Sequence, residues 1–331
     1  MKLQFKHIVL IALILCLPTS PAWAWYGKGH VVATQFALAA LPDDVPPFFR
    51  EGGELVVSTV VDPDTFARGG GPWELRSVES QEHFFDLEFF TKAADTKEPW
   101  TLPATRFEFL EQCYGRNVKP YRVGLAPYAI MEWTQRLTVA FAEHRRWPED
   151  KAIQQKCLVY AGFLAHYAQD ICQPLHTTIS YDGRVEKPSD PSPRTGIHNK
   201  VDSLIGRLDA KPTDVLTGLN TTPLYNREDL PKPPTTAPTS GPTARPGPSP
   251  LLQAVMAQIE ASHKLVGTVY ELEESLPDFD YSKPLSDTPA VHDFALERLR
   301  ETTRFTASLF LTAWRDSEFI EIPAWHRGEH E

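Results

Sequence analysis

The segment His166-Tyr-Ala-Gln-Asp170-Ile-Cys-Gln-Pro174-Leu-His176 places two histidines and an aspartate at spacings that suit a metal site. Residues four apart lie on one face of a helix, so His166 and Asp170 should stand one above the other. Pro174 cannot continue that helix, and the turn it requires can bring His176 back toward the same point. Two imidazoles and a carboxylate that converge favour a first-row metal ion, with zinc as the first choice. A lone histidine on a helix is more often a core or surface residue, so the rest of the chain must support the site.

This segment ends the helix that we expect at the centre of the fold. Residues 150–171 carry apolar side chains on nearly every side, which is typical of a buried helix. Residues 54–61 are apolar and β-branched, and they fit either a buried helix or a strand. A short helix is expected from Gly196, and longer helical patterns cover 31–41, 106–113, 126–144, 251–272 and 291–313. Because the strand signal is weak and no internal repeat is visible, we predict an all-α fold.

Length and composition bound the domain organisation. A chain of 331 residues can form one large domain or two small ones, and 42% hydrophobic residues with 8 Trp and 18 Phe support a sizeable core. We predict a single domain over residues 25–331. Between residues 223 and 250, Pro, Thr and Ser dominate and leave little to bury. That segment is expected to be an exposed loop or a disordered insertion.

Residues 1–24 have the pattern of a secretory signal peptide. Lys2 and Lys6 precede an apolar stretch over 8–17, and Ala22-Trp-Ala24 is a small-x-small cleavage site. The apolar stretch is too short to span a bilayer. We therefore expect an exported, soluble protein, periplasmic or secreted. Cleavage after Ala24 would make Trp25 the first residue.

Cysteine usage and charge exclude two classes of protein. Removal of the signal would leave Cys113, Cys157 and Cys172. The last two should lie too far apart on one helix to pair, so at most one disulfide is possible and the chain is not a disulfide scaffold. The net charge of −10 disfavours a general polyanion binder. Three bound zinc ions would add about six positive charges in one cleft, which leaves room for local phosphate binding.

Several residues of the types that bind zinc precede the central helix, and each can also be explained by a purely structural role. Glycines at 27 and 29 would let the N-terminus fold back beside His30, although spacing alone favours a flexible tail. Asp62-Pro-Asp64 is most often a turn or a helix cap, within what we expect to be a loop through residue 71. By itself, His83 fits a partly buried structural histidine.

After the central helix, His198 and Asp202 repeat the four-residue spacing. His144 precedes two arginines and is interpreted as solvent-exposed, not as a ligand. In chain order, the candidate metal ligands are Trp25, His30, Asp64, His83, His166, Asp170, His176, His198 and Asp202. Nine groups are too many for one ion, and they fit a trinuclear site in which one carboxylate bridges two metals.

This ordered set resembles the zinc-dependent single-strand nucleases of fungi and plants (the S-one/P-one type), which share a superfamily with bacterial zinc phospholipases C. The matching features are Trp at the mature N-terminus with His five residues later, an Asp in a Pro-containing turn, and His83-Phe-Phe-Asp86. They continue with the His166–His176 segment and end with His198-x-x-x-Asp202. The likeness covers roughly the first 180 mature residues.

The resemblance implies a mainly helical domain with three zinc ions in one cleft. One ion would be held by Asp64, His83, His166 and Asp170. A second would be held by His176, His198 and Asp202. The third would take the α-amino nitrogen and carbonyl oxygen of Trp25, with His30 and the bridging Asp170. It further implies a metal-activated hydroxide that attacks phosphorus in line.

The resemblance also points to two catalytic candidates, and the chain departs from the family near one of them. The counterpart of Asp86 in the nucleases lies beside the substrate. The nucleases carry an Arg three residues after the Asp64 position, where this chain has Ala67, so Arg68 is the candidate for that role. A Gly-Gly-Asn before the penultimate ligand is replaced here by Asp182-Gly183 and a Pro-containing loop. We expect a retained metal cluster beneath a rebuilt substrate cleft.

Three functions follow from these patterns. The first is a nuclease or nucleotidase acting on single-stranded DNA, RNA or 3′-nucleotides, favoured by the Trp-to-His spacing and by Asp as the final ligand. The phospholipases typically space Trp and His further apart and end in Glu. The second is a zinc phospholipase C acting on phospholipid head groups, and the third is a non-catalytic zinc-stabilised binding protein. No stable protein partner is implied, and a monomer is expected.

Overall fold

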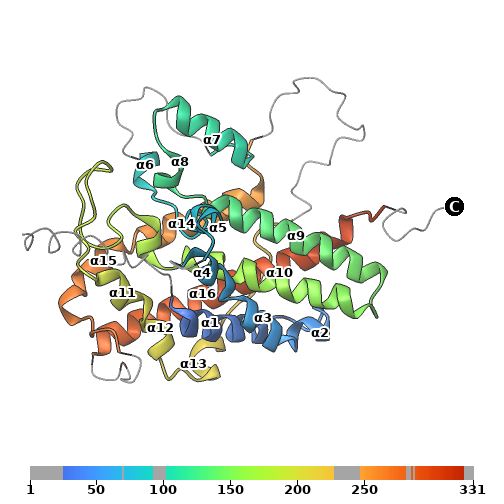
Figure 1. Cartoon of the computed structure of the whole chain (residues 1–331). Helices are drawn as coiled ribbons and strands as arrows, with labels where there is room; N and C mark the ends of the chain where they lie inside the picture. The colour runs from blue at the N-terminus through green and yellow to red at the C-terminus, as the bar shows by residue number, and fades with distance from the viewer. Residues whose placement is uncertain are drawn as a thin grey trace, which may run out of the picture.

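The computed structural model describes residues 25–68, 71–91, 102–226, 247–280, 285 and 288–323. Within these ranges every regular element is helical (Figure 1), and an isolated β-bridge pairs Tyr181 with Gly183. The predicted all-α fold is therefore confirmed. The predicted signal segment and residues 227–246 of the Pro-rich segment lie outside the described residues, so those two predictions stay predictions.

The helices follow one another along the chain. Their bounds are α1 Gly27–Ala39, α2 Pro47–Arg50, α3 Gly53–Thr59, α4 Asp62–Ala67, α5 Trp73–Glu79, α6 Glu88–Thr91, α7 Arg106–Gly115, α8 Pro120–Val123, α9 Ala126–Arg146, α10 Lys151–Asp170, η1 Pro174–Thr177, α11 Ile197–Asp202, α12 Leu204–Arg207, α13 Pro212–Leu216, α14 Pro250–His263, α15 Val266–Glu271, η3 Glu273–Ser275, α16 Pro289–Asp316 and η4 Ser317–Phe319. The central helix α10 packs against α9, α3 and α16 (Figure 1).

The apolar interior has two parts that meet in the His166–His176 segment. The larger part contains Ile171 and Cys172 of the segment, together with an aromatic group in which Phe49 lies 4.8 Å from Phe141 and 5.4 Å from Phe310 between ring centroids. The smaller part contains Trp25 and Leu175, with apolar side chains from α1, α11, α12 and the first half of α16. The candidate ligands of this segment therefore sit where two packed cores join.

Two segments differ from the sequence prediction, and a third segment that the sequence left ambiguous can now be assigned. Asp62–Ala67 is helix α4 and not a loop, since Pro63 suits the first turn of a helix and the two aspartates complement its N-terminal dipole. The ambiguous range 54–61 is mostly helix α3. The single helix predicted over 251–272 is two helices, α14 and α15, with Lys264 and Leu265 between them.

The interpretation of His144 as solvated surface is wrong. The His144 side chain is buried, with its ring centroid 4.4 Å from that of Phe48, and burial lowers its pKa. The next residue takes the exposed position instead: the Arg145 guanidinium lies 3.6 Å from the Trp314 ring centroid. The two arginines after His144 suggested a solvated stretch, but on a helix each consecutive residue faces a different direction.

The remaining sequence statements concern thiols and membranes. Cys113, Cys157 and Cys172 are all buried and free, so the single disulfide that the sequence left open does not form. Among the described helices, none is both long and apolar enough to cross a membrane.

Candidate metal centre

The end of α10 holds its two candidate ligands in a rigid, dry position. Asp150 caps the start of the helix, where its carboxylate accepts hydrogen bonds from the Ala152 and Ile153 amides at 2.8 and 3.2 Å. Twenty residues later the helix ends at Asp170, and Pro174 opens the 3₁₀ helix η1, which carries His176. His166 and Asp170 are fully buried and His176 nearly so. The predicted turn after the helix is confirmed.

A glycine brings a neighbouring helix close enough to orient His166. A side chain at Gly162 would meet the Thr59 hydroxyl at 1.9 Å, so this close approach of α3 and α10 requires glycine. One turn further along α10, His166 Nδ1 lies 2.7 Å from the Val60 carbonyl oxygen at the end of α3. The contact between the helices therefore fixes the direction in which the His166 ring points.

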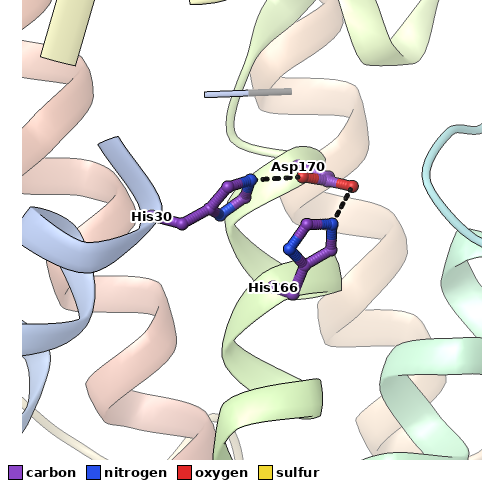
Figure 2. Close-up of side chains that lie close together, drawn as sticks. All are labelled: His30, His166 and Asp170. Carbon is purple, nitrogen blue, oxygen red and sulfur yellow. Dashed lines mark ion pairs between the residues drawn. The ribbon is translucent and has the colours of Figure 1, made fainter. Parts of the chain in front are cut away.

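The first cluster joins α1 and α10 through His30, His166 and Asp170 (Figure 2). His30 Nε2 lies 3.4 Å from Asp170 Oδ1, and His166 Nε2 lies 3.5 Å from Asp170 Oδ2. The two imidazole rings stack with centroids 4.1 Å apart. Figure 2 shows both rings directed at the same carboxylate, one at each of its oxygens.

The second cluster adds residues from α4 and from the turn after α5. It contains Asp64, His83 and His166. His166 Nε2 lies 3.1 Å from His83 Nδ1 and 3.8 Å from Asp64 Oδ1. His83 Nδ1 is also 3.0 Å from Asp170 Oδ2. The two oxygens of Asp170 therefore face different clusters, which is the geometry that a bridging carboxylate needs.

The third cluster is formed by His176 of η1 with His198 and Asp202 of α11. His176 Nε2 and His198 Nε2 lie 3.0 Å apart, and His198 Nε2 lies 3.2 Å from Asp202 Oδ2. The charges of Asp202 and His198 act on the pKa of Asp170, the first raising and the second lowering it. His176 Nδ1 also lies 2.7 Å from the His83 carbonyl oxygen, so the third cluster adjoins the second, and the three form one centre.

Four of the histidines are oriented by an oxygen acceptor behind the ring. The bonds run from His30 Nδ1 to Gln169 Oε1 at 2.7 Å, from His166 Nδ1 to Val60 O at 2.7 Å, from His176 Nδ1 to His83 O at 2.7 Å, and from His198 Nδ1 to Tyr181 O at 3.0 Å. A carbonyl oxygen can only accept, so in each ring Nδ1 carries the hydrogen and the neutral form keeps its lone pair on Nε2. All four Nε2 atoms face the clusters, an arrangement typical of metal-binding histidines.

Several carboxylate oxygens of the centre lack a hydrogen-bond donor. Within the described residues, no hydrogen bond reaches Asp64 Oδ2, Asp202 Oδ2 or either oxygen of Asp170, although all are buried. Burial raises the pKa of Asp64 to about 8 and raises the pKa of Asp170 well above its usual range. Burial likewise keeps the pKa of His166 and His176 well below the usual value. Buried anionic oxygens beside imidazole lone pairs need a cation, and this donor set suits zinc.

Two buried glutamines support the ligands, and the sequence interpretation did not single them out. Gln169 accepts from His30 and donates to the Thr34 hydroxyl at 2.8 Å. Gln173 donates to Asp202 Oδ1 at 2.7 Å, and its own oxygen accepts from the Leu175 amide. Gln169 directly precedes Asp170, and Gln173 lies three residues from both Asp170 and His176, so their position inside the His166–His176 segment was the available signal.

Trp25 is buried against α10 and does not belong to a flexible tail. Its indole Nε1 donates to the Gln169 carbonyl oxygen at 3.0 Å, and α1 begins two residues later at Gly27. The preference for a flexible tail, drawn from spacing alone, is therefore wrong. The anchored indole places the residue beside His30 and its partner Gln169. Metal binding by the Trp25 backbone stays a prediction.

The two catalytic candidates lie around the centre and outside the three clusters. Arg68 is exposed at the end of α4, and its charge lowers the pKa of Asp64, so it lies at the rim of the second cluster. Asp86 is buried, which raises its pKa well above the usual value. Its neighbour Phe85 donates a backbone hydrogen bond to the His176 carbonyl at 2.9 Å. Asp86 is thus one residue from direct backbone pairing with a ligand.

Tyr26 is a further rim residue that sequence reasoning missed. Burial, with the charges of Asp202 and Asp64, raises the pKa of its phenol to about 12, and the charge of Arg68 opposes this rise. These influences place Tyr26 between the second and third clusters, near Arg68. Its ring lies against that of Phe279, with centroids 4.6 Å apart. No spacing pattern could have found it, since it precedes α1 and belongs to no repeated pair of residues.

Comparison with known proteins gives little beyond the geometry. No family model matches the chain, and no curated protein matches it. A crystal structure of Clostridium perfringens alpha-toxin from an avian strain superposes with a TM-score of 0.40 and 14% sequence identity, over 91% of this chain and 68% of that chain. A likeness of this size leaves the function to be argued from the site.

Proposed function

We propose that this chain is an exported zinc-dependent hydrolase that cleaves phosphoester bonds of single-stranded nucleic acid and of 3′-nucleotides. The observation that carries the proposal is one buried carboxylate, Asp170, whose oxygens lie beside His30 of the first cluster and His83 of the second, with a third cluster nearby. Three zinc ions would be held by the three clusters, with Trp25 completing the His30 site. A purely structural metal site would not need three clusters coupled in this way.

The residues divide the work between holding metals and handling the substrate. Zinc ions bound here would supply Lewis acidity for a phosphoryl oxygen and lower the pKa of water, which is the chemistry of multinuclear phosphoesterases. The histidines keep their lone pairs inward through their carbonyl partners. Arg68 and Tyr26 stand at the rim near Asp64, where a guanidinium and a hydroxyl can donate to the oxygens of a phosphate group.

A second candidate function, phospholipase C, is favoured by one specific observation. Helix α5 follows the metal-binding helix α4, packs on it, and exposes the apolar side chains of Trp73, Leu75 and Val78. Trp73 is 64% exposed. Such an apolar face near a phosphoesterase centre could enter the head-group region of a lipid surface. The polar, charged rim made by Arg68 and Tyr26 fits either substrate, so only turnover separates the two functions.

One assay set tests the proposal. Purified protein that begins at Trp25 is loaded with zinc and offered single-stranded DNA, RNA, 3′-AMP and phosphatidylcholine vesicles. Release of 5′-nucleotides and of adenosine without lipid cleavage supports the nuclease. Lipid cleavage alone, lost in Trp73→Ala, establishes the phospholipase instead. If about three zinc ions bind per chain and no substrate is turned over, the protein is a zinc-stabilised binding protein and both enzymatic proposals fail.

A further inference from the structure

A basic and aromatic stretch lies on the outer side of α7 and α8. From Tyr114 to Gly124 the chain carries three basic residues, each three positions from the next, and no acidic one, although the whole chain has a net charge of −10. Tyr114 is 63% exposed and Tyr121 58% exposed. The α7–α8 surface is defined here by the side chains of Tyr114, Arg116, Lys119, Tyr121 and Arg122.

The α7–α8 surface rests on a well-anchored base. Phe109 and Cys113 bury the inner side of α7 in the main core. Arg106 at its start forms a hydrogen-bonded ion pair with Glu132 at 3.0 Å and a second with Glu82. On the outer side, Lys119 Nζ lies 5.8 Å from the centroid of the Tyr114 ring. Figure 1 shows α7 and α8 at the upper edge of the molecule.

The surface is connected to the metal centre through one backbone segment. The Val123 carbonyl at the end of α8 accepts a hydrogen bond from the Asp86 amide at 2.7 Å. On its other side the same segment pairs with η1, since the Phe85 amide donates to His176 O. Burial raises the pKa of Asp86, and the charge of Arg122 partly offsets that rise. The α7–α8 surface thus lies one segment away from His83 and His176.

We propose that the α7–α8 surface binds single-stranded nucleic acid and delivers it to the metal centre; this rests on the proposed nuclease function. Basic side chains follow a phosphate backbone, and exposed aromatic rings stack on bases that a single strand leaves unpaired. Concentrating positive charge beside the centre lets an otherwise acidic protein attract a polyanion at one place. A membrane-binding surface would pair such cations with Trp, Phe or Leu side chains, and the Tyr114–Gly124 stretch contains none of them.

Binding is tested on the zinc-loaded protein with a labelled 20-residue oligothymidylate whose phosphorothioate linkages resist hydrolysis. Fluorescence anisotropy measures its affinity for the wild type, for the double variant Arg116→Gln/Lys119→Gln, for Tyr114→Ala/Tyr121→Ala, and for the control Lys151→Gln. Lys151 is an exposed lysine at the opposite end of α10, about 28 Å along the axis from Asp170. We expect each double variant to bind about tenfold more weakly, and the control to bind as the wild type does.

The salt dependence identifies the cause. Each phosphate contact contributes about 0.7 to the slope of log affinity against log salt for a single strand. The Arg116→Gln/Lys119→Gln slope should therefore be smaller by about 1.4, whereas the tyrosine variant keeps the wild-type slope. Hydrolysis of 3′-AMP should be unchanged in both variants.

The outcomes separate this proposal from the nuclease function. If the strand binds through these residues but is never cleaved in its natural phosphodiester form, the nuclease function fails and the surface stands. If the strand does not bind, or both double variants bind like the wild type, the surface proposal is wrong. Binding of vesicles of phosphatidylglycerol and phosphatidylcholine, lost in the same variants and without strand binding, would replace it with a membrane contact.

Discussion

The metal centre and its rim are built in opposite ways. At the centre, the ligand side chains come from five separate segments but are nearly all buried, and the outer nitrogen of each oriented histidine has a single acceptor. At the rim, Arg68, Trp73 and Tyr121 are exposed, and their elements are short helices or helix ends. Ligand geometry is thus set by core packing, whereas substrate contacts depend on surface side chains.

Because of this difference, substitutions at the centre and substitutions at the rim should have different effects. A buried ligand that is lost leaves other buried polar atoms without a partner, so most substitutions there fail. A rim residue can be replaced at little cost in stability, because solvent satisfies what the side chain leaves behind. Changes at the centre should therefore alter metal content and folding together. Changes at the rim should alter turnover while metal content stays constant.

The largest effect is expected for Asp170→Asn. The amide keeps the shape of the side chain but removes the charge that two clusters share, so two zinc ions should be lost or strongly weakened. Loss of several kcal/mol of Lewis-acid stabilisation corresponds to about 10³-fold or more in turnover. Elemental analysis and turnover of 3′-AMP measure both.

His176→Ala is the matched comparison for Asp170→Asn. His176 belongs to the third cluster alone, so about one zinc ion should leave and the other two should remain. Equal metal loss in the two variants would contradict the bridging role of Asp170.

The next largest effect on zinc content and activity is expected when an additional residue precedes Trp25. Only a free α-amino group has a lone pair to donate to a metal, because an amide nitrogen does not. We expect one zinc ion fewer and most activity lost, with the indole of Trp25 still held by Gln169 O. Mass spectrometry of the intact protein confirms the extension, and elemental analysis counts the ions. Unchanged metal content would remove Trp25 from the ligand set.

Gln173→Ala tests whether the centre depends on the buried residues behind its ligands. The variant removes the donor to Asp202 Oδ1 and should lower zinc affinity of the third cluster by about 10- to 100-fold. A competition titration with a zinc chelator measures it. Gln154→Ala, a half-buried glutamine near the start of α10, is the control and should bind zinc like the wild type. If both variants keep wild-type affinity, Gln173 has only a packing role.

The sequence predicted the centre better than the rim because most candidate ligands of the centre stand at regular spacings along the chain. Helix geometry predicts that His166 lies beside Asp170 and that His198 lies beside Asp202. The fixed backbone of Pro174 predicts the turn after the helix. The three long helices α9, α10 and α16 were also predictable, since each has an apolar pattern many residues long. The grouping of His30 with Asp170, by contrast, was available only through resemblance to a family.

Residues that act across the fold could not be found from spacing. The charges of Asp64 and Asp202 act on Tyr26 although both residues are far from it in the sequence, and nothing in its own neighbourhood signals this. His144 was misplaced for the same reason, since its partner Phe48 lies nearly a hundred residues earlier in the chain. Helix α4 was mistaken for a loop because a six-residue helix has too few turns to show a periodic pattern.

Arg68→Ala tests the rim directly and should have a smaller effect than the changes at the centre. Removing one charged hydrogen-bond donor to a phosphate oxygen costs about 1.5–3 kcal/mol, or roughly 10- to 100-fold in kcat/KM. Zinc content should not change, because Arg68 is exposed and is not a ligand. Arg76→Ala, an exposed arginine on α5, serves as the control. Metal loss in Arg68→Ala, or full activity, would contradict its place at the rim.

The smallest predicted effect is a pH dependence that belongs to the centre alone. In metal-free protein, burial raises the pKa of Asp64 to about 8 from an ordinary value of 3.8. Between these values the unfolded chain releases its proton and the folded chain keeps it, so stability present at low pH is lost as pH rises. The slope is about 1.4 kcal/mol per pH unit for one such group. His166 and His176, whose pKa is lowered in the folded state, oppose it only slightly above about pH 7, where histidines of the unfolded chain are already mostly neutral.

Urea unfolding of chelator-treated protein at pH 7 and pH 8 measures this slope, since the free energy of unfolding should fall by about 1 kcal/mol or more. Zinc-loaded protein should show no such fall, because a bound cation keeps the carboxylate ionised in the folded state. Asp64→Asn removes the titrating group, so the metal-free variant should lose part of the slope while Asp170 retains the rest. Identical slopes with and without zinc would mean that the buried carboxylates are neutralised by something other than a metal. Metal binding would then no longer explain the contrast between the centre and the rim.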